Sequence, residues 1–388
     1  MSRERFALVA GGGTAGHLQP ALAIAEALVE AGHERSSIEF VGSDRGQDRS
    51  MLEGRGFPST LLPGRGIVRS LEPGALRSNA GAVAGLVMAG IRGFGVVLRS
   101  KPSVVVSVGG YASLPASLAA VLLGVPLVLV NVDAVPGAAN RLFGRFARAS
   151  AVGWAGTPLP RAVVTGTPVR PEIGAVRRMP ADRETARRQL GLPAERTTVV
   201  VFGGSLGARR VNQSVSDLAD RWKDRSDRSI YHIVGRRDWV DGGPVPAAHD
   251  VADEAAGPLG LALVRVPYHD RMAVVYAAAD IVVCRAGAMT VAELAAAGVP
   301  AVLVPLPGAP GDHQTANARV LADAGAAVVL PDAECTAAAL GRILDDVLSD
   351  PGRVQAMERA ASALARSDAA AAAAAVVVAH ARVRGGGR

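Results

Sequence analysis

The sequence predicts an α/β protein made of two doubly wound halves, each with parallel strands joined by crossover helices. Short β-branched runs alternate with segments of helical spacing along the whole chain. A strand, a glycine loop and an amphipathic helix occupy residues 5–33, and the same succession begins again at residues 197–222. The length of 388 residues also suits two domains better than one.

Each half is expected to hold several further strands, because apolar runs of strand length recur between helical segments. In the first half they cover residues 37–43, 103–110, 125–133 and 161–169. In the second half they cover residues 229–235, 261–268, 279–286, 300–308 and 326–332. The predicted domains are residues 1–168 and 169–388, and the alanine-rich last helix after Ser367 could pack back on the first domain.

Composition narrows the classes of ligand. Lys and Arg number 42 against 35 Asp and Glu, a net charge of +7, but aromatic residues are only 4% and no RNA-binding or zinc-finger pattern occurs. A phosphate-rich ligand or an anionic membrane surface is therefore favoured over nucleic acid. No apolar run reaches the ~18 residues that span a bilayer, and the N-terminal run is too short for a signal peptide. We expect a cytoplasmic protein that can touch a membrane, without a disulfide framework since only Cys284 and Cys335 are present.

Residues 279–318 indicate a nucleotide site. The strand-like run "DIVVCRA" breaks at Gly287, and a helix with Gly298 as its stop follows. The first N–H groups of that helix, from Ala288 to Thr290, form a candidate phosphate seat. Glu293, one turn further on, could accept hydrogen bonds from both hydroxyls of a ribose. The alternative is that Glu293 only favours the helix dipole from an exposed first turn.

The first glycine loop, "GGGTAGH", satisfies the dinucleotide fingerprint with Gly11, Gly13 and Gly16. With Glu39 as the ribose acid, the same pattern would also fit a nicotinamide-binding protein. His17 directly follows the loop, where a neutral imidazole could take a proton near pH 7. The alternative for such a solitary histidine is a structural or surface role.

Two more loops are candidate anion cradles. Gly109, Gly110 and Tyr111 end a strand before a helix capped by Ser113, and their N–H groups could bind a second diphosphate. "FGGSLGARR" offers Ser205 and the N–H groups of residues 206–208. Arg170, near the joint of the two halves, could bring a bidentate donor to the same ligand. For the loop at Gly109 and Gly110, the alternative is an ordinary strand-to-helix turn.

Residues 65–101 carry six cations and one acid, interleaved with apolar side chains at helical spacing. Basic residues beside an apolar face can hold a protein at an anionic lipid surface. The alternative is an amphipathic helix packed on the domain core with solvated arginines.

Together the motifs resemble the MurG family, which moves N-acetylglucosamine (GlcNAc) from UDP-GlcNAc onto undecaprenyl-diphospho-MurNAc-pentapeptide, turning lipid I into lipid II in peptidoglycan synthesis. The resemblance rests on blocks in the correct order: "GGGTAGHLQPALAIAEAL", "SVGGYASLP", "GTPVR", "FGGSLGARRVNQ", "VCRAGAMTVAELAAAGVPAVLVPLP" and "DHQTANA". It implies the GT-B fold, two Rossmann-like domains facing across a cleft, with the donor on the second and the lipid acceptor on the first. It also implies a peripheral protein on the cytoplasmic face of the cell membrane, and no cofactor or metal, in agreement with the absence of an Asp-x-Asp triplet.

The resemblance assigns site residues by position. Thr14, Ala15 and Gly16 fall in the loop that meets donor and acceptor, and His269 falls where the family's backbone holds uracil. The remaining UDP-GlcNAc contacts that it implies are Arg170, Ser205, Ala288, Met289, Thr290, Val291, Ala292, Glu293 and Gln314. Gly109, Gly110 and Tyr111 are assigned to the acceptor diphosphate.

One block departs from the family. Where the family has His-Glu-Gln-Asn, this chain has Val130, Asn131, Val132 and Asp133, so Asp133 takes the position of a donor-contacting asparagine. His17 is the first candidate for the catalytic base, and Asp133 is the second. A transferase acting on another polyprenyl lipid or a natural product, and a UDP-GlcNAc epimerase, are the rival functions.

Overall fold

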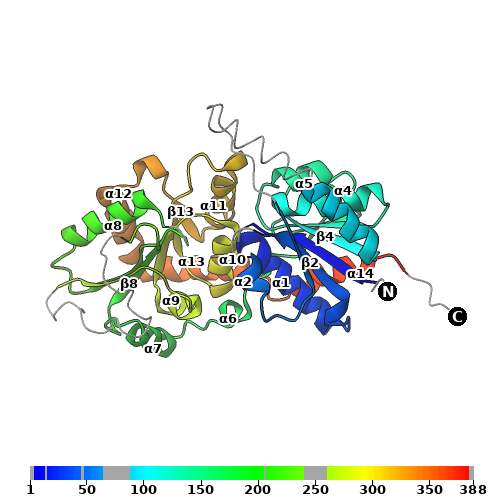
Figure 1. Cartoon of the computed structure of the whole chain (residues 1–388). Coiled ribbons are helices and arrows are strands. Elements are labelled where there is room, and N and C mark those ends of the chain that lie inside the picture. Colours follow the sequence, from blue (N-terminus) through cyan, green and yellow to red (C-terminus); the bar gives the residue numbers. More distant parts are fainter. Residues whose placement is uncertain are drawn as a thin grey trace. The chain divides into compact units, whose positions relative to one another are not determined.

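The computed structural model describes residues 4–13, 15–44, 48–63, 88–204, 207–239 and 260–383. The chain forms two compact units, each with its own parallel sheet (Figure 1). Unit 1 comprises residues 1–169 together with 368–388, and unit 2 comprises residues 170–367.

Unit 1 contains a seven-stranded sheet in the order β3-β2-β1-β4-β5-β6-β7, and every pair of neighbours is parallel. Its strands are β1 (Ala7–Gly11), β2 (Ile38–Ser43), β3 (Ser59–Leu62), β4 (Val104–Gly109), β5 (Leu127–Asn131), β6 (Ala149–Val152) and β7 (Ala162–Val164). Its helices are α1 (Ala15–Glu30), α2 (Asp48–Leu52), α4 (Leu114–Leu122), α5 (Ala138–Phe143), α14 (Ala369–His380) and a helical stretch over residues 88–100, with short 3-10 turns at Arg35–Ser37 and Tyr111–Ser113.

Unit 2 contains a six-stranded parallel sheet in the order β10-β9-β8-β11-β12-β13. Its strands are β8 (Thr197–Phe202), β9 (Arg228–Ile233), β10 (Ala262–Val266), β11 (Ile281–Cys284), β12 (Ala301–Leu303) and β13 (Ala327–Val329). Its helices are α6 (Pro171–Gly174), α7 (Pro180–Gln189), α8 (Arg209–Arg221), α9 (Met272–Ala278), α10 (Ala288–Ala297), α11 (His313–Asp323), α12 (Ala337–Leu348) and α13 (Pro351–Ala363), with 3-10 turns at Pro310–Asp312 and Asp332–Glu334.

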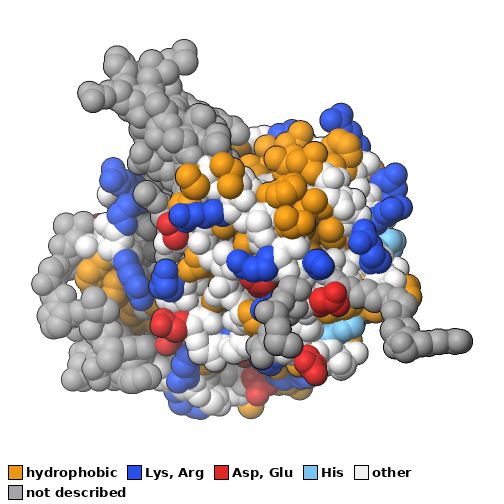
Figure 2. Space-filling view, turned by 45° about the vertical axis from the view of Figure 1, so that its right-hand side comes forward, with side chains coloured by type: hydrophobic (Ala, Val, Ile, Leu, Met, Phe, Trp, Pro, Cys, Tyr) orange, Lys and Arg blue, Asp and Glu red, His pale blue; other side chains and the backbone are white. Residues whose placement is uncertain are grey.

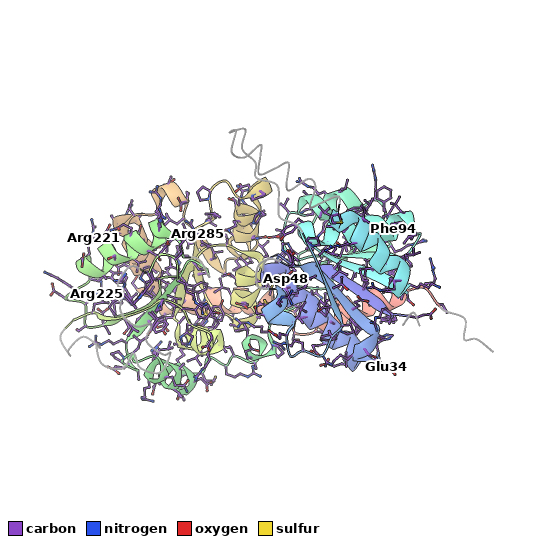
Figure 3. The ribbon with its side chains drawn as sticks, in the orientation of Figure 1. Glu34, Asp48, Phe94, Arg221, Arg225 and Arg285 are labelled. Carbon is purple, nitrogen blue, oxygen red and sulfur yellow. The ribbon has the colours of Figure 1, made fainter. Side chains whose placement is uncertain are left out.

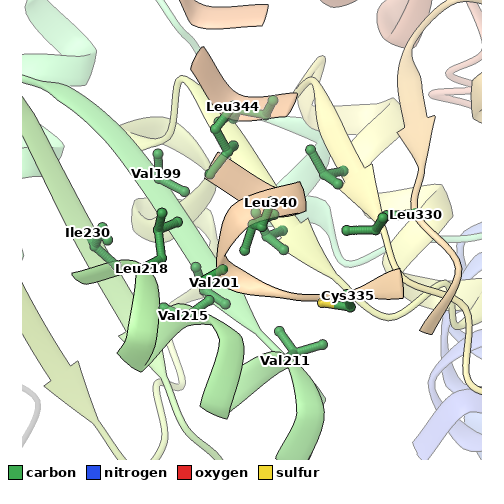
Figure 4. Packing of buried hydrophobic residues seen from close by; sticks show 14 of the residues in the cluster. Val199, Val201, Val211, Val215, Leu218, Ile230, Leu330, Cys335, Leu340 and Leu344 are labelled. Carbon is green, nitrogen blue, oxygen red and sulfur yellow. The ribbon is translucent and has the colours of Figure 1, made fainter. Parts of the chain in front are cut away.

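The packing in the core of unit 2 explains why most of its strands have continuous apolar sequences. Helices α8 and α12 cover one face of the sheet, so Val199 and Val201 of β8 pack against Leu218 of α8 and Leu340 and Leu344 of α12 (Figure 4). A parallel sheet covered on both faces buries both sides of each strand. Strands β8, β11 and β12 are accordingly buried along almost their whole length and show no alternation between apolar and polar residues.

Helix α14 belongs to unit 1 although it lies at the other end of the sequence. It packs beside α1 and contacts β4, β5 and β6 of the first sheet (Figure 1). Its apolar face is made of small side chains, and Ala373, Ala374 and Val377 are buried. Unit 1 is therefore assembled from two separate stretches of the chain.

Both sheets reverse their winding at one point. In unit 1 the chain winds outward in opposite directions from β1 and β4, and in unit 2 from β8 and β11. Ligands of doubly wound folds bind beyond the carboxyl ends of the two strands at such a switch point. The loops that follow β1, β4, β8 and β11 are therefore the places where a site is expected.

Candidate functional site

The turn between β11 and α10 has the geometry of an anion seat. Gly287 occupies the N-cap of α10 with extended dihedral angles (φ −66°, ψ 148°), and Gly298 ends the helix in the left-handed conformation. Ala288, Met289 and Thr290 form the first turn and are half-buried. Their N–H groups have no acceptor within the helix, which is the arrangement that binds a phosphate.

Glu293 is held inside unit 2 rather than exposed. It is 7% exposed, and its two carboxylate oxygens have different partners. Arg170 donates to Oε1 from Nη2 at 3.2 Å and from Nε at 3.3 Å, while the Tyr276 hydroxyl donates to Oε2 at 3.0 Å. Burial raises the pKa of Glu293, and Arg170 and Tyr276 act in the opposite direction. The alternative of an exposed first-turn acid is therefore wrong.

Gln314 of α11 holds the backbone of the turn between β11 and α10, the turn that it was predicted to face. Its Oε1 accepts hydrogen bonds from the N–H of Ala286, at 3.2 Å, and from that of Leu306, at 2.9 Å. Asn317, one turn further along α11, donates from Nδ2 to the Ala286 carbonyl at 3.2 Å. Helix α11 thus holds the loops that follow β11 and β12, and a contact of Gln314 with a sugar stays a prediction.

His269 lies in the loop that follows β10 and is buried, with 6% of its surface exposed. Its Nδ1 lies 2.9 Å from the Tyr231 hydroxyl, and the two rings meet edge to face. Burial raises the pKa of Tyr231, so the phenol keeps its proton. This pair fixes the loop whose backbone is assigned to uracil.

The second glycine loop is described only in part, since Ser205 and Leu206 lie outside the described residues. Gly207 has φ +85°, and a Cβ there would stand 2.6 Å from a carboxylate oxygen of Asp238. Asn212 of α8 connects this region to β9, because its Oδ1 lies 2.9 Å from His232 Nε2 and its Nδ2 donates to the Val234 carbonyl at 2.9 Å. The cradle predicted from the N–H groups of residues 206–208 stays a prediction.

In unit 1, His17 and the loop after β4 lie together. His17 is half-buried on the first turn of α1. A Cβ added to Gly110 would lie 3.3 Å from His17 Nδ1, and one added to Gly109 would lie 3.6 Å from Nε2. The imidazole thus packs directly against the backbone of these two glycines, and only glycine permits so close an approach at φ +94° and +75°. Ser113, predicted as a cap, donates instead to the Gly110 carbonyl at 2.9 Å.

The first glycine loop holds an internal carboxylate that the sequence did not reveal. Asp48, the first residue of α2, is 1% exposed (Figure 3). The N–H of Gly13 donates to its two oxygens at 2.9 and 3.0 Å, and the N–H of Ser43 donates to Oδ2 at 2.8 Å. A Cβ at Gly12 would overlap this carboxylate. One N–H that the fingerprint would offer to a phosphate is therefore already used.

The other residues of that loop are placed as follows. Ala15 begins α1 and Gly16 is half-buried within its first turn, whereas Thr14 lies outside the described residues. Tyr111 follows β4, and its hydroxyl lies 2.8 Å from Ser43 Oγ. Tyr111 therefore connects the loop after β4 to the end of β2.

The block that departs from the family is tied down by Asn140 of α5. Asn140 donates from Nδ2 to the Val130 carbonyl at 3.0 Å and to Asn131 Oδ1 at 3.1 Å, and Asn131 in turn donates to the Asp133 carbonyl at 2.6 Å. Trp154 donates to the Val132 carbonyl at 3.2 Å. Asp133 lies half-buried just beyond β5, at the carboxyl edge of the sheet.

Glu39 does not fit the role of a ribose acid. It is the second residue of β2, at the amino end of the strand, and nucleotides bind beyond the carboxyl ends. Its carboxylate is buried and accepts from Arg5, Thr60 and Ser100 at 2.9 to 3.2 Å. This removes the acid on which the nicotinamide alternative depended.

In the described part of the chain, no group of three or more His, Cys, Asp and Glu side chains could hold a metal ion. Within the same ranges, no helix is both long and apolar enough to cross a bilayer.

Comparisons with known proteins assign the fold and the family. The model of the glycosyltransferase family 28 N-terminal domain matches residues 7–152, and that of the family 28 C-terminal domain matches residues 198–375. A relative from Nocardioides sp. is 40% identical over 93% of this chain and 94% of its own length, and one from Desulforudis audaxviator is 37% identical over 92% and 94%. Each is named a UDP-N-acetylglucosamine–N-acetylmuramyl-(pentapeptide) pyrophosphoryl-undecaprenol N-acetylglucosamine transferase.

Among solved structures, MurG of Acinetobacter baumannii is 28% identical and superimposes with a TM-score of 0.71, covering 97% of this chain and 99% of its own. The two parallel sheets and these matches define the class of the protein, a glycosyltransferase with the GT-B fold. It belongs to glycosyltransferase family 28, and the predicted resemblance to the MurG family is confirmed.

Proposed function

We propose that the chain transfers N-acetylglucosamine from UDP-GlcNAc to the 4-hydroxyl of the N-acetylmuramic acid in undecaprenyl-diphospho-MurNAc-pentapeptide. The observation that carries the proposal is the likeness to transferases of that name at 37% to 40% identity, over 92% to 93% of the chain. Such extended identity favours this acceptor over a natural product or a different polyprenyl lipid.

Unit 2 is proposed to hold the donor. The first turn of α10 takes the diphosphate, Glu293 takes the ribose and the loop at His269 takes the uracil. Gln314 and the rest of α10, with Val291 and Ala292, shape the pocket around the sugar. What supports this arrangement is that the helix terminus and the buried acid occur on one helix, beyond the switch point of the sheet.

Arg170 has a double role in this proposal. In the structure its guanidinium pairs with Glu293 and lies 3.8 Å from Glu172, so it is an anion-binding group already placed beside the ribose acid. A bound diphosphate would compete for the same guanidinium. Donor binding therefore includes a redistribution of the hydrogen bonds of Arg170.

The reaction inverts the anomeric carbon. The acceptor hydroxyl oxygen forms a bond to this carbon as the bond to the diphosphate oxygen breaks, and the electron pair leaves with UDP. The α10 terminus and Arg170 stabilise the negative charge that grows on the leaving group, and the loss of one such donor typically costs about 2.7 to 4 kcal/mol. The hydroxyl proton passes to a base of unit 1.

His17 is the proposed base, and Gly109, Gly110 and Tyr111 are proposed to bind the acceptor diphosphate next to it. The support is the packing of the His17 ring against these two glycines, which would place the base beside the acceptor. Asp133 remains the second candidate, because it follows β5 at the same edge of the sheet.

The test is a transfer assay with purified protein, UDP-GlcNAc and a short-chain lipid I analogue. Disaccharide product is expected in the wild type, and His17→Ala should lower turnover by about 10² or more at unchanged donor affinity. Full turnover in His17→Ala, with Asp133→Asn inactive, would move the role to Asp133. No product with this acceptor from a folded, UDP-binding protein would reject the proposed acceptor.

We also propose that unit 1 binds an anionic membrane surface from the cytoplasmic face, as a peripheral protein. Exposed large hydrophobic side chains lie on and beside three helical segments of unit 1, residues 88–100, α4 and α5, and we call them the apolar patch: Met88, Ile91, Phe94, Leu98, Leu118, Leu122, Leu142 and Phe146. Figure 2 shows hydrophobic side chains gathered on one face, with Lys and Arg side chains around them. Basic residues beside exposed apolar area favour an anionic bilayer surface.

Residues 65–101 were predicted to bind an anionic lipid surface. Of this segment, residues 88–101 contribute to the patch, and residues 65–87 lie outside the described residues. Reversing the charge of the exposed Arg92 and Arg99 should reduce sedimentation with vesicles that contain anionic lipid. A matched control is the double reversal of Arg221 and Arg342, which are exposed in unit 2. Equal loss of binding in both variants would show a nonspecific charge effect and contradict the proposal.

A further inference from the structure

Tyr276 is a buried polar group next to the proposed ribose site. It lies on α9, is fully buried and donates its hydroxyl proton to Oε2 of Glu293 at 3.0 Å. Its ring packs edge to face on Phe202 at the end of β8, with ring centroids 6.2 Å apart. The ring is therefore held by packing, and the hydroxyl has a fixed direction.

The Glu293 carboxylate is placed from both sides. Arg170 binds Oε1 and Tyr276 binds Oε2, so the plane of the carboxylate is fixed by two donors on two different helices or helix termini. An ionised carboxylate has about four lone-pair positions, two on each oxygen. Oε1 already accepts two hydrogen bonds from Arg170, whereas Oε2 accepts one from Tyr276 and can accept one more. A position on Oε1 becomes available when the bound diphosphate takes one of the Arg170 donors, and two adjacent ribose hydroxyls are then a matching pair of donors.

Tyr276 is a donor under all ordinary conditions. Burial and the neighbouring Glu293 raise the pKa of Tyr276 well above its usual value, so the phenol stays protonated. A carboxylate as buried as Glu293 needs such donors to remain ionised. Arg170 alone could supply them to one oxygen, but the orientation of the second oxygen depends on Tyr276.

We propose that Tyr276 is a positioning residue that makes this site selective for ribonucleotides over 2′-deoxyribonucleotides, because it sets Glu293 to accept from both ribose hydroxyls. The inference rests on the proposed function, in which Glu293 contacts the ribose. Tyr276 itself does not touch the nucleotide. It acts through the carboxylate, so its loss should weaken the binding of UDP, which has both hydroxyls, more than that of 2′-deoxy-UDP, which keeps only the 3′-hydroxyl.

The experiment compares the dissociation constants of UDP and 2′-deoxy-UDP for the full chain by calorimetry. A hydrogen bond to a charged group contributes about 1.5 to 3 kcal/mol, so the wild type should prefer UDP by about tenfold or more. Tyr276→Phe keeps the ring and its packing, and should lower this preference at least about threefold. Ser214→Ala is the control, because it removes another buried hydroxyl of unit 2, which donates to the Cys335 carbonyl at 2.7 Å. Its preference should equal that of the wild type.

A double-mutant cycle separates positioning from general loosening of the fold. In a Glu293→Gln background, Tyr276→Phe should change the preference no further, because both substitutions act on one interaction. Ligand-induced thermal shifts with the two nucleotides give the same comparison if Tyr276→Phe is less stable. If the wild type prefers UDP and Tyr276→Phe keeps the same preference for UDP over 2′-deoxy-UDP, the inference about Tyr276 is overturned, while the proposed function stands.

Failure of the underlying proposal has a different signature. A wild-type protein that binds both nucleotides equally would reject Glu293 as the ribose acid, and the inference with it. A wild-type protein that binds neither would reject UDP-GlcNAc as the donor.

Discussion

Replacement of Asp48 tests whether an internal carboxylate shapes the first glycine loop. Asp48→Ala would remove the carboxylate that accepts from the buried N–H of Ser43 and from the N–H of Gly13. A buried donor that loses its partner costs about 1 to 3 kcal/mol, and the half-buried Gly13 adds about 1 more, so the free energy of unfolding should fall by about 2 to 4 kcal/mol. Asp48→Asn keeps one acceptor oxygen and should lose about half as much.

The assay is urea unfolding followed by circular dichroism, paired with turnover in the transfer assay. Glu53→Gln is the matched control, since it removes an exposed carboxylate just beyond the same short helix. Because Asp48 also fixes the loop before His17, both Asp48 variants should lose turnover at temperatures where they remain folded. Wild-type unfolding midpoints in Asp48→Ala would refute the reasoning, since they would mean that the two N–H groups find water at no cost.

Two further predictions concern unit 2. Burial lowers the pKa of His232 to about 4 in the folded protein. As the pH falls, this histidine is therefore protonated in the unfolded chain before it is protonated in the folded one. The free energy of unfolding should drop by about 2 kcal/mol between pH 7 and pH 5. His232→Gln should flatten that dependence in urea titrations, and an equally steep slope would contradict the assignment. Gly298→Ala places a methyl group against Ser362 Oγ at a residue with φ +63°, and it should lower the free energy of unfolding by about 1 to 2 kcal/mol. The double variant Gly298→Ala/Ser362→Ala should recover part of this loss. An unchanged melting temperature in the single variant would show that the helix end relaxes freely.

Most of the parallel strands were predictable from the sequence because both their faces are buried. Continuous apolar runs marked β1, β2, β4, β5 and β7 to β13, and the glycine loops marked the strand ends. Two strands were missed. β3 (Ser59–Leu62) lies at the edge of its sheet between two prolines, and β6 (Ala149–Val152) consists mainly of Ala and Ser, which have little intrinsic strand preference.

The parts of the site that are contiguous in the sequence could be predicted, whereas the contacts between residues far apart in the sequence could not. The strand, Gly287 and the first turn of α10 are contiguous, so the anion seat could be read from spacing. Tyr276 and Asp48 reach their partners across 17 and 35 residues, and no periodicity reports such contacts. A tyrosine inside an otherwise apolar helix was the available signal for Tyr276, since a buried phenol needs an acceptor.

The misassignment of Glu39 has a physical lesson. An acid near a strand of a doubly wound fold is a ribose ligand only at the carboxyl end. The start of β2 at Ile38 places Glu39 at the opposite edge, where Arg5 neutralises it.

The packing of α14 on α1 makes unit 2 an insertion within unit 1. During synthesis, residues 170–367 are made before α14, so the earlier residues of unit 1 wait with the α14-binding side of α1 uncovered. Domains generally complete in the order of their synthesis. Here unit 1, which begins the chain, cannot finish folding until its last helix has been made.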